Sequence, residues 1–296
     1  MTALAVARFV GHLATAGFFG GLVFVAALWP AGAGDRRTRA LLSVAVIAGI
    51  TSSLAGIGLQ GASAAALPAS AATRREVVRQ ALETHLGQLW AVRALLWVLA
   101  AVVLVAVLQG AESAVGSAGW RLGALAVGFG LLRASGMSGH AGDTARTGWS
   151  ALADMVHLAG VTTWVGGLAV LLVGLLPRRQ PAELAAVVPR FSRIAFGAVV
   201  AIAAAGTFLA WQLVGSVGGL VHTSYGRTLL VKLVVFALVL GVASRSRSWV
   251  AHRLSLVASG TATTVRPFMY SVAAEVVLVL VVLGAAGVLV TASPGR

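Results

Sequence analysis

The sequence predicts an all-α integral membrane protein with eight transmembrane helices. Of its 296 residues, 59% are hydrophobic and only 10% are charged, and the mean hydropathy is +0.95. Soluble domains carry about a quarter of charged residues, so a chain this apolar needs lipid around it. The apolar residues also form long runs with short polar gaps, and a helix that crosses a bilayer needs about 20 such residues.

Eight runs are long enough to cross the bilayer, and they leave no room for a separate soluble domain. The first run lacks a charged leader and is too long for the apolar core of a secretory signal, so we expect it to remain as a helix. The longest gap, 67–88, contains TRREVVRQALETH, whose polar and apolar positions predict a short helix lying in the membrane interface. The expected spans are residues 4–29, 41–66, 89–109, 120–138, 149–176, 193–214, 227–244 and 268–291.

The formal net charge of +14 comes from basic residues spread over the gaps between spans. This distribution favours orientation in a membrane over binding to nucleic acid, which needs one basic patch or stripe. Loops rich in arginine stay in the cytoplasm, so we expect the odd-numbered loops inside and both termini outside, although Arg74, Arg75 and Arg79 count against it. The odd loops carry Arg36, Arg37, Arg39, Arg121, Arg178, Arg179, Arg190, Arg193, Arg245, Arg247, Arg253 and Arg266, and the even loops carry Arg74, Arg75, Arg79, Arg146 and Arg227.

Two absences narrow the chemistry of the chain. It contains no cysteine, which excludes disulfides and thiolate metal sites, so any ligand for a soft metal must be methionine or histidine. It also lacks the GxxxxGK[ST] loop that binds nucleotide phosphates, so this chain is not expected to pump with ATP. We therefore expect a binding or transport protein and not an enzyme.

An internal repeat divides the chain into two halves. HLATAGFFGGL at 12–22 resembles HLAGVTTWVGGL at 157–168, with one residue of slippage. Such a match predicts parallel four-helix halves, 1–140 and 141–296, related by a pseudo-twofold axis along the membrane normal. A second match follows the first in the same order in both halves. At the start of the third span, Thr84, Gly87 and Arg93 have the same spacing as Thr223, Gly226 and Lys232 at the start of the seventh.

The repeat makes His12 and His157 counterparts at a similar depth, roughly 12 Å below the outer face. The glycine pairs at 20–21 and 166–167 lie about two turns deeper, where missing side chains let helices approach closely. Binding sites of transporters commonly lie where such halves meet. We therefore expect the two imidazoles to converge on one site.

The imidazoles and thioethers in the outer half of the predicted bundle suit copper. Thioether sulfur favours Cu(I), and imidazole accepts copper in either oxidation state. Asp154 lies three residues before His157 on the same helix face, so its carboxylate is expected to accept the second ring N–H. Met155 lies about 200° around the helix from His157 and is expected to be a packing residue. The candidate ligands are His157, His12, His140, Met137, His85 and His222.

Two further interpretations follow from the polar residues within spans. Glu275 and Lys232, in the last two spans, are expected to form a structural ion pair, or Glu275 acts alone in a proton or ion relay. Histidines at one depth on two helices also suit bis-imidazole ligation of haem b, so an electron carrier is the alternative function.

The motif DMVHLAGVTTWVGGL at 154–168 and the segment SYGRTLLVKLVVFALVL at 224–240, with Glu275 and Pro294, resemble the copper resistance protein D (CopD) family. The region similar to that family covers about 190–294. The resemblance implies a bacterial inner-membrane protein that binds copper and moves it inward, surrounded by membrane lipids. No carrier domain of the CopC type is fused to the chain, so a periplasmic or extracellular copper carrier is expected to be a separate protein.

Overall fold

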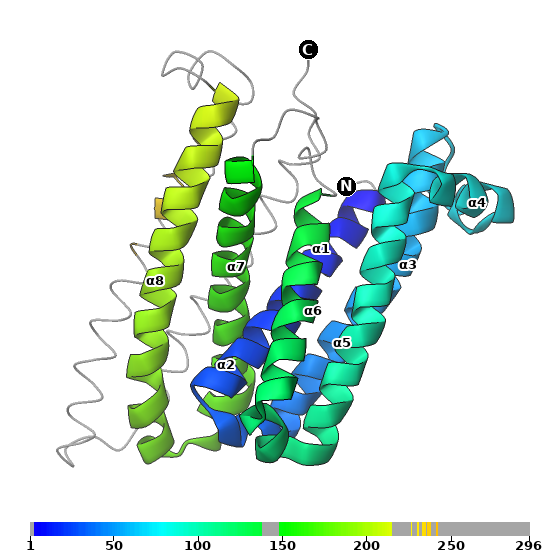
Figure 1. The fold of residues 1–296 in the computed structure, drawn as a ribbon. Helices are drawn as coiled ribbons and strands as arrows, with labels where there is room; N and C mark the ends of the chain where they lie inside the picture. Colours follow the sequence, from blue (N-terminus) through cyan, green and yellow to red (C-terminus); the bar gives the residue numbers. More distant parts are fainter. Residues whose placement is uncertain are drawn as a thin grey trace.

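The computed structural model describes residues 3–137 and 148–214, together with single positions between 226 and 241. Within these residues the regular structure is entirely helical, and long helices run side by side in alternating directions (Figure 1). The helices α1, α5 and α7 run one way, and α3, α6 and α8 return. The all-helical architecture predicted from the sequence is confirmed over this part of the chain.

The first span is one continuous path with a change of helical pitch in its middle. Helix α1 covers Ala3–Thr15, a π-helical turn covers Ala16–Gly20, and α2 covers Gly21–Ala27. A 3₁₀ turn at Pro30–Gly34 then leads to α3, Arg36–Ala64. The carboxylate of Asp35 accepts a hydrogen bond from the backbone N–H of Thr38 at 2.9 Å, which caps the start of α3.

A short helix separates the second and third spans, as the sequence predicts. After a 3₁₀ turn at Ala69–Thr73, α4 covers Arg75–Glu83 and projects sideways beyond the ends of α3 and α5 (Figure 1). Its apolar side chains Val77 and Ala81 are buried against Gly61 of α3. The amphipathic pattern of TRREVVRQALETH therefore forms a helix, and its position in the membrane interface stays a prediction.

The remaining helices complete the bundle. Helix α5 covers His85–Gly116 and contains a break at Ala111, where φ is 46°, so its straight part ends close to the expected limit of the span at residue 109. Helix α6 covers Ala118–Met137. The fifth span consists of α7, Gly148–Val170, a π-helical turn at Leu171–Leu175 and a 3₁₀ turn at Leu176–Arg178, and α8 covers Pro181–Val214.

Six of the eight expected spans thus coincide with helices, with shifts at their ends. Five helical stretches in the described residues are long and apolar enough to cross a membrane, and α6, which carries Arg121 and Arg133, is not among them. The expected spans 227–244 and 268–291 lie outside the continuously described residues. The number of eight helices and the outside position of both termini therefore stay predictions.

The outer surface of the bundle is apolar, as expected for contact with lipid. Leu95 and Val102 on α5 are 67% and 64% exposed, and Val44 and Ile47 on α3 are equally open. In water such a surface would be an aggregation site, whereas in a bilayer it meets acyl chains. Membrane lipids therefore surround this part of the chain.

Helices α3 and α5 are held together by tryptophans seated on glycines. The indole of Trp97 covers Gly49, and the indole of Trp90 covers Gly56, so closely that a methyl group at either glycine would overlap the ring. Both indoles are fully buried, and Phe18 meets Trp97 edge-on with ring centroids 5.7 Å apart. These two close contacts fix how α3 and α5 are aligned along their lengths.

The first and fifth spans cross with no side chain between their backbones. A methyl group on Gly20 would overlap the carbonyl oxygen of Thr162, and one on Gly166 would overlap the carbonyl oxygen of Ala16. Gly20 lies four residues after Ala16, and Gly166 lies four residues after Thr162, so the two contacts are reciprocal. The close approach predicted from the glycine pairs is therefore confirmed at this crossing.

The loops at the far end of the bundle are joined by an ion-pair cluster. The guanidinium of Arg178 lies 3.1 Å from Glu183 and 3.8 Å from Asp35, and it stacks 5.5 Å from the centroid of the Trp29 ring. These contacts connect the turn before α3 with the turn before α8. They add a polar link between the first and fifth spans at the end opposite to α4.

Replacement of Gly166 by alanine is expected to destabilise the protein, because the new methyl group overlaps backbone that cannot move aside as a side chain can. Overpacking of this kind costs about 1–3 kcal/mol. The matched control is Gly197→Ala on α8, where an added methyl group meets nothing within 4 Å. Thermal unfolding in detergent should show a clear drop in melting temperature for the first variant only. Equal melting temperatures would contradict the crossing.

Candidate functional site

The described candidate residues gather in the half of the bundle where α4 lies. His85 is exposed at the first position of α5, Met137 is the last residue of α6, and His157 lies in the third turn of α7. His12, near the end of α1, and Asp154, on α7, lie in the same half. The other candidates, His140, His222, Lys232 and Glu275, lie outside the described residues.

The His157 ring is oriented by α8. Its Nδ1 lies 3.1 Å from the backbone carbonyl oxygen of Ile202. A carbonyl oxygen only accepts hydrogen bonds, so Nδ1 carries the proton and donates it. The same ring lies against Gly206, whose missing side chain leaves space for it. In this tautomer the lone pair available for a metal is on Nε2.

Asp154 lies at the junction of α6 and α7. Its carboxylate is in contact with Gly136, the residue before Met137, so closely that a side chain there would displace it. This contact brings the end of α6 beside the second turn of α7. A carboxylate, a thioether-bearing residue and the His157 helix thus meet at one end of the bundle. The backbone carbonyl of Ile202 is the partner of His157 at Nδ1, and the role expected for Asp154 beside the imidazole stays a prediction.

His12 lies in a different environment from His157. Two guanidinium groups, those of Arg93 and Arg8, act on it electrostatically. Gly11, its neighbour in the chain, touches the guanidinium of Arg93 and the hydroxyl group of Ser52. His12 therefore belongs to the group formed by α1, α3 and α5, and His157 contacts α8. Positive charge beside His12 also opposes binding of a cation there.

Arg93 is the functional candidate that the sequence did not single out. It is 1% exposed, and its Nε, Nη1 and Nη2 have no hydrogen-bond partner. Burying a charge costs on the order of several kcal/mol, and the cation–π contact with Trp90, at 5.5 Å, returns about 2 kcal/mol. The sequence signal was only an arginine within a predicted span, with Lys232 as its counterpart in the repeat.

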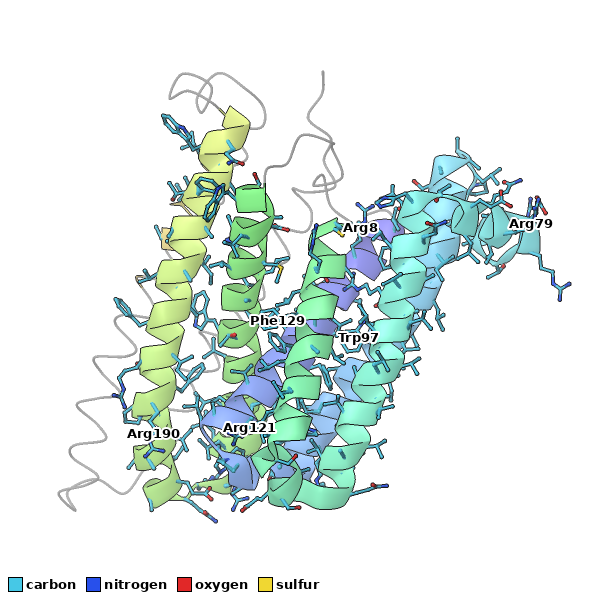
Figure 2. The ribbon with its side chains drawn as sticks, viewed as in Figure 1. Arg8, Arg79, Trp97, Arg121, Phe129 and Arg190 are labelled. Atoms are coloured by element: carbon cyan, nitrogen blue, oxygen red, sulfur yellow. The ribbon has the colours of Figure 1, made fainter. Side chains whose placement is uncertain are left out.

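Figure 2 shows the distribution of basic side chains along the bundle. Arg8 and Arg79 lie toward the end that carries α4, and Arg121 and Arg190 lie toward the opposite end. At that opposite end Arg121 donates to the carbonyl oxygen of Val115 at 2.8 Å, and Arg39 donates to that of Ala33 at 2.7 Å. Both arginines thus satisfy carbonyl groups in turns and helix ends, in addition to any effect on orientation.

No group of three or more histidine, aspartate or glutamate side chains is close enough to hold a metal ion within residues 3–137 and 148–214. In this part of the chain, His12 and His157 likewise have no contact that joins them. The convergence of the two imidazoles on one site stays a prediction without support from these contacts. A metal at His157 would need further ligands from Met137 or from residues beyond those described.

The bundle and its buried polar groups define a multi-pass helical membrane protein with an oriented imidazole inside. Comparison with known families then gives its relatives. Residues 1–152 match the N-terminal domain described as copper resistance protein D-like, and residues 185–289 match copper resistance protein D. The chain belongs to the copper resistance protein D family. The resemblance noted from the DMVH and WVGGL motifs is therefore confirmed.

A curated relative is the copper transport protein CutJ of Bacillus subtilis, 34% identical over 232 residues. The match covers 75% of this chain and 42% of the relative, so the chain spans less than half of the relative's length. No solved structure matches the chain. These matches support a copper-related membrane function, and none of them supports the haem alternative.

The contact with Ile202 predicts that His157 is protonated at Nδ1. A larger residue in place of Gly206 should disturb this position of the ring, because Gly206 lies against it. In ¹⁵N spectra of histidine-labelled protein, Gly206→Val should remove the signal of this tautomer, because its side chain displaces the ring. Gly197→Val, in open space on the same helix, should leave that signal unchanged. The opposite tautomer in the parent protein would contradict the assignment.

Proposed function

We propose that this chain transports copper across the cytoplasmic (inner) membrane of a bacterium, in the inward direction. The support is the membership of the copper resistance protein D family, the similarity to the Bacillus copper transport protein CutJ and five helices apolar enough to span a bilayer. Copper is the substrate in this proposal and is bound only transiently, during transport. The chain acts as a transporter and not as an enzyme.

The orientation in the proposal puts the end with α4 outside. Support comes from the described loop arginines, which are more numerous at the end opposite α4, and basic loops stay in the cytoplasm. With this orientation, His157, Met137 and Asp154 lie toward the outer face. Copper delivered from outside therefore meets them first, and a separate carrier of the CopC type is the proposed donor.

The capture site in the proposal is centred on His157. The observation that carries it is the hydrogen bond between Nδ1 and the Ile202 carbonyl, because it fixes the ring and assigns Nε2 as the ligating nitrogen. Met137, at the neighbouring helix end, is the proposed soft ligand, and Asp154 supplies negative charge beside it. His85, His140, His222 and His12 remain further candidate ligands, and Lys232 with Glu275 a candidate ion pair or relay.

The experiment is copper accumulation in cells that express the parent chain or His157→Ala at matched membrane levels. The parent should raise cell-associated copper, and the variant should lose most of this gain, at least about tenfold in apparent affinity, because a ligating nitrogen is gone. Arg79→Gln, which removes an exposed side chain in the same half that is not a candidate ligand, is the control and should stay within about twofold of the parent.

The outcomes separate the parts of the proposal. A parent chain that lowers cellular copper would reverse the direction, and unchanged accumulation in His157→Ala would reject the capture site. Metal analysis of purified protein gives an independent measurement, since His157→Ala should hold less copper per chain than the parent. A Soret band that shifts on reduction would instead restore the haem alternative.

A further inference from the structure

The buried guanidinium of Arg93 lies where three helices meet. On α5 it is placed between Trp90 and Trp97, the two indoles seated on glycines of α3. Toward α1 it touches Gly11, which contributes no side chain, and the hydroxyl group of Ser52 lies beside the same point. The charge is therefore enclosed by aromatic rings, backbone and a single hydroxyl group.

Among the residues that the structure describes, the surroundings of Arg93 hold more positive charge and no carboxylate that pairs with it. Arg8 lies in the same region, with a buried Nε that has no partner and an Nη2 that donates to Gln60 at 3.4 Å. None of the ion pairs found in the described residues includes Arg93 or Arg8. Charged groups inside membranes are almost always paired, so this cluster lacks a negative partner.

We propose that Arg93, with Arg8 nearby, binds a small monovalent anion, of which chloride is the physiological example. A guanidinium offers five N–H donors and no acceptor, and Arg93 donates none of them to a partner in the described part of the chain. An anion here would form charge-assisted hydrogen bonds in surroundings of low dielectric constant, where they are strong. Because Gly11 has no side chain, the guanidinium of Arg93 lies directly against the backbone of α1.

The proposal concerns an anion and stands apart from copper transport, so its test needs no copper. Full-length protein in detergent is unfolded by heat in sodium chloride or sodium gluconate at equal ionic strength. Chloride should raise the melting temperature of the parent in a saturable way, by about 5 °C, because it binds only the folded state. Arg93→Gln should lose this rise, and Arg79→Gln, which removes an exposed arginine on α4, should keep it.

A second measurement does not depend on the folding of the arginine variant. Iodide is a heavy-atom quencher, and Trp90 lies 5.5 Å from the guanidinium carbon although bulk solvent does not reach it. Parent fluorescence should show a saturable component of iodide quenching that chloride reverses and Trp90→Phe removes. Quenching that is only linear in the parent, or equal melting temperatures in chloride and gluconate, would overturn the proposal. The same chloride effect in Arg93→Gln would also overturn it.

Discussion

At the crossing of the first and fifth spans, the backbones of Gly20 and Gly166 meet with nothing between them. Most of the bundle takes its position from this constraint. The contact brings α2 and the π-helical turn before it onto α7, and α7 in turn carries α8 and the His157 ring. Helices in a bilayer have little hydrophobic drive to associate, so close packing at small residues is a main source of their attraction.

The contact is also reciprocal, since Gly20 meets the carbonyl of Thr162 and Gly166 meets that of Ala16. A twofold axis through the crossing would produce such a pair of contacts, which supports the proposed relation between 1–140 and 141–296. Both spans further contain a π-helical turn, Ala16–Gly20 and Leu171–Leu175, although at different distances from the glycines. The predicted pseudosymmetry is thus argued from the crossing itself, and it stays a prediction.

His12 and His157, which the repeat predicts to be equivalent, lie in different surroundings. His12 experiences the positive charges of Arg93 and Arg8, and His157 donates to a neutral carbonyl of α8. A cation is repelled at the first and tolerated at the second. Positions that the repeat predicts to be equivalent therefore need not share the same chemistry, and the proposal of copper capture is centred on His157 alone.

The sequence predicted the elements that depend on hydropathy and on residue size. Long apolar runs located six helices, the amphipathic segment 67–88 located α4, and the glycine pairs located the crossing. The sequence did not predict the Ile202 carbonyl as the partner of His157, because every residue except proline carries the same backbone groups. It also did not predict the isolation of Arg93, since a span shows depth along the helix but not which neighbours face it.

The enclosure of Arg93 also has a consequence for biogenesis. When α5 enters the membrane it has to bring a cation with it, and the cost of about 2.5–3.5 kcal/mol for arginine at mid-helix is an upper limit for Arg93, which lies in the third turn of α5. Leucine, valine and alanine between residues 94 and 108 make α5 the most apolar of the five spanning helices, which offsets that cost. The helix can thus enter lipid as a single segment, and in the folded bundle its guanidinium lies against α1 and α3.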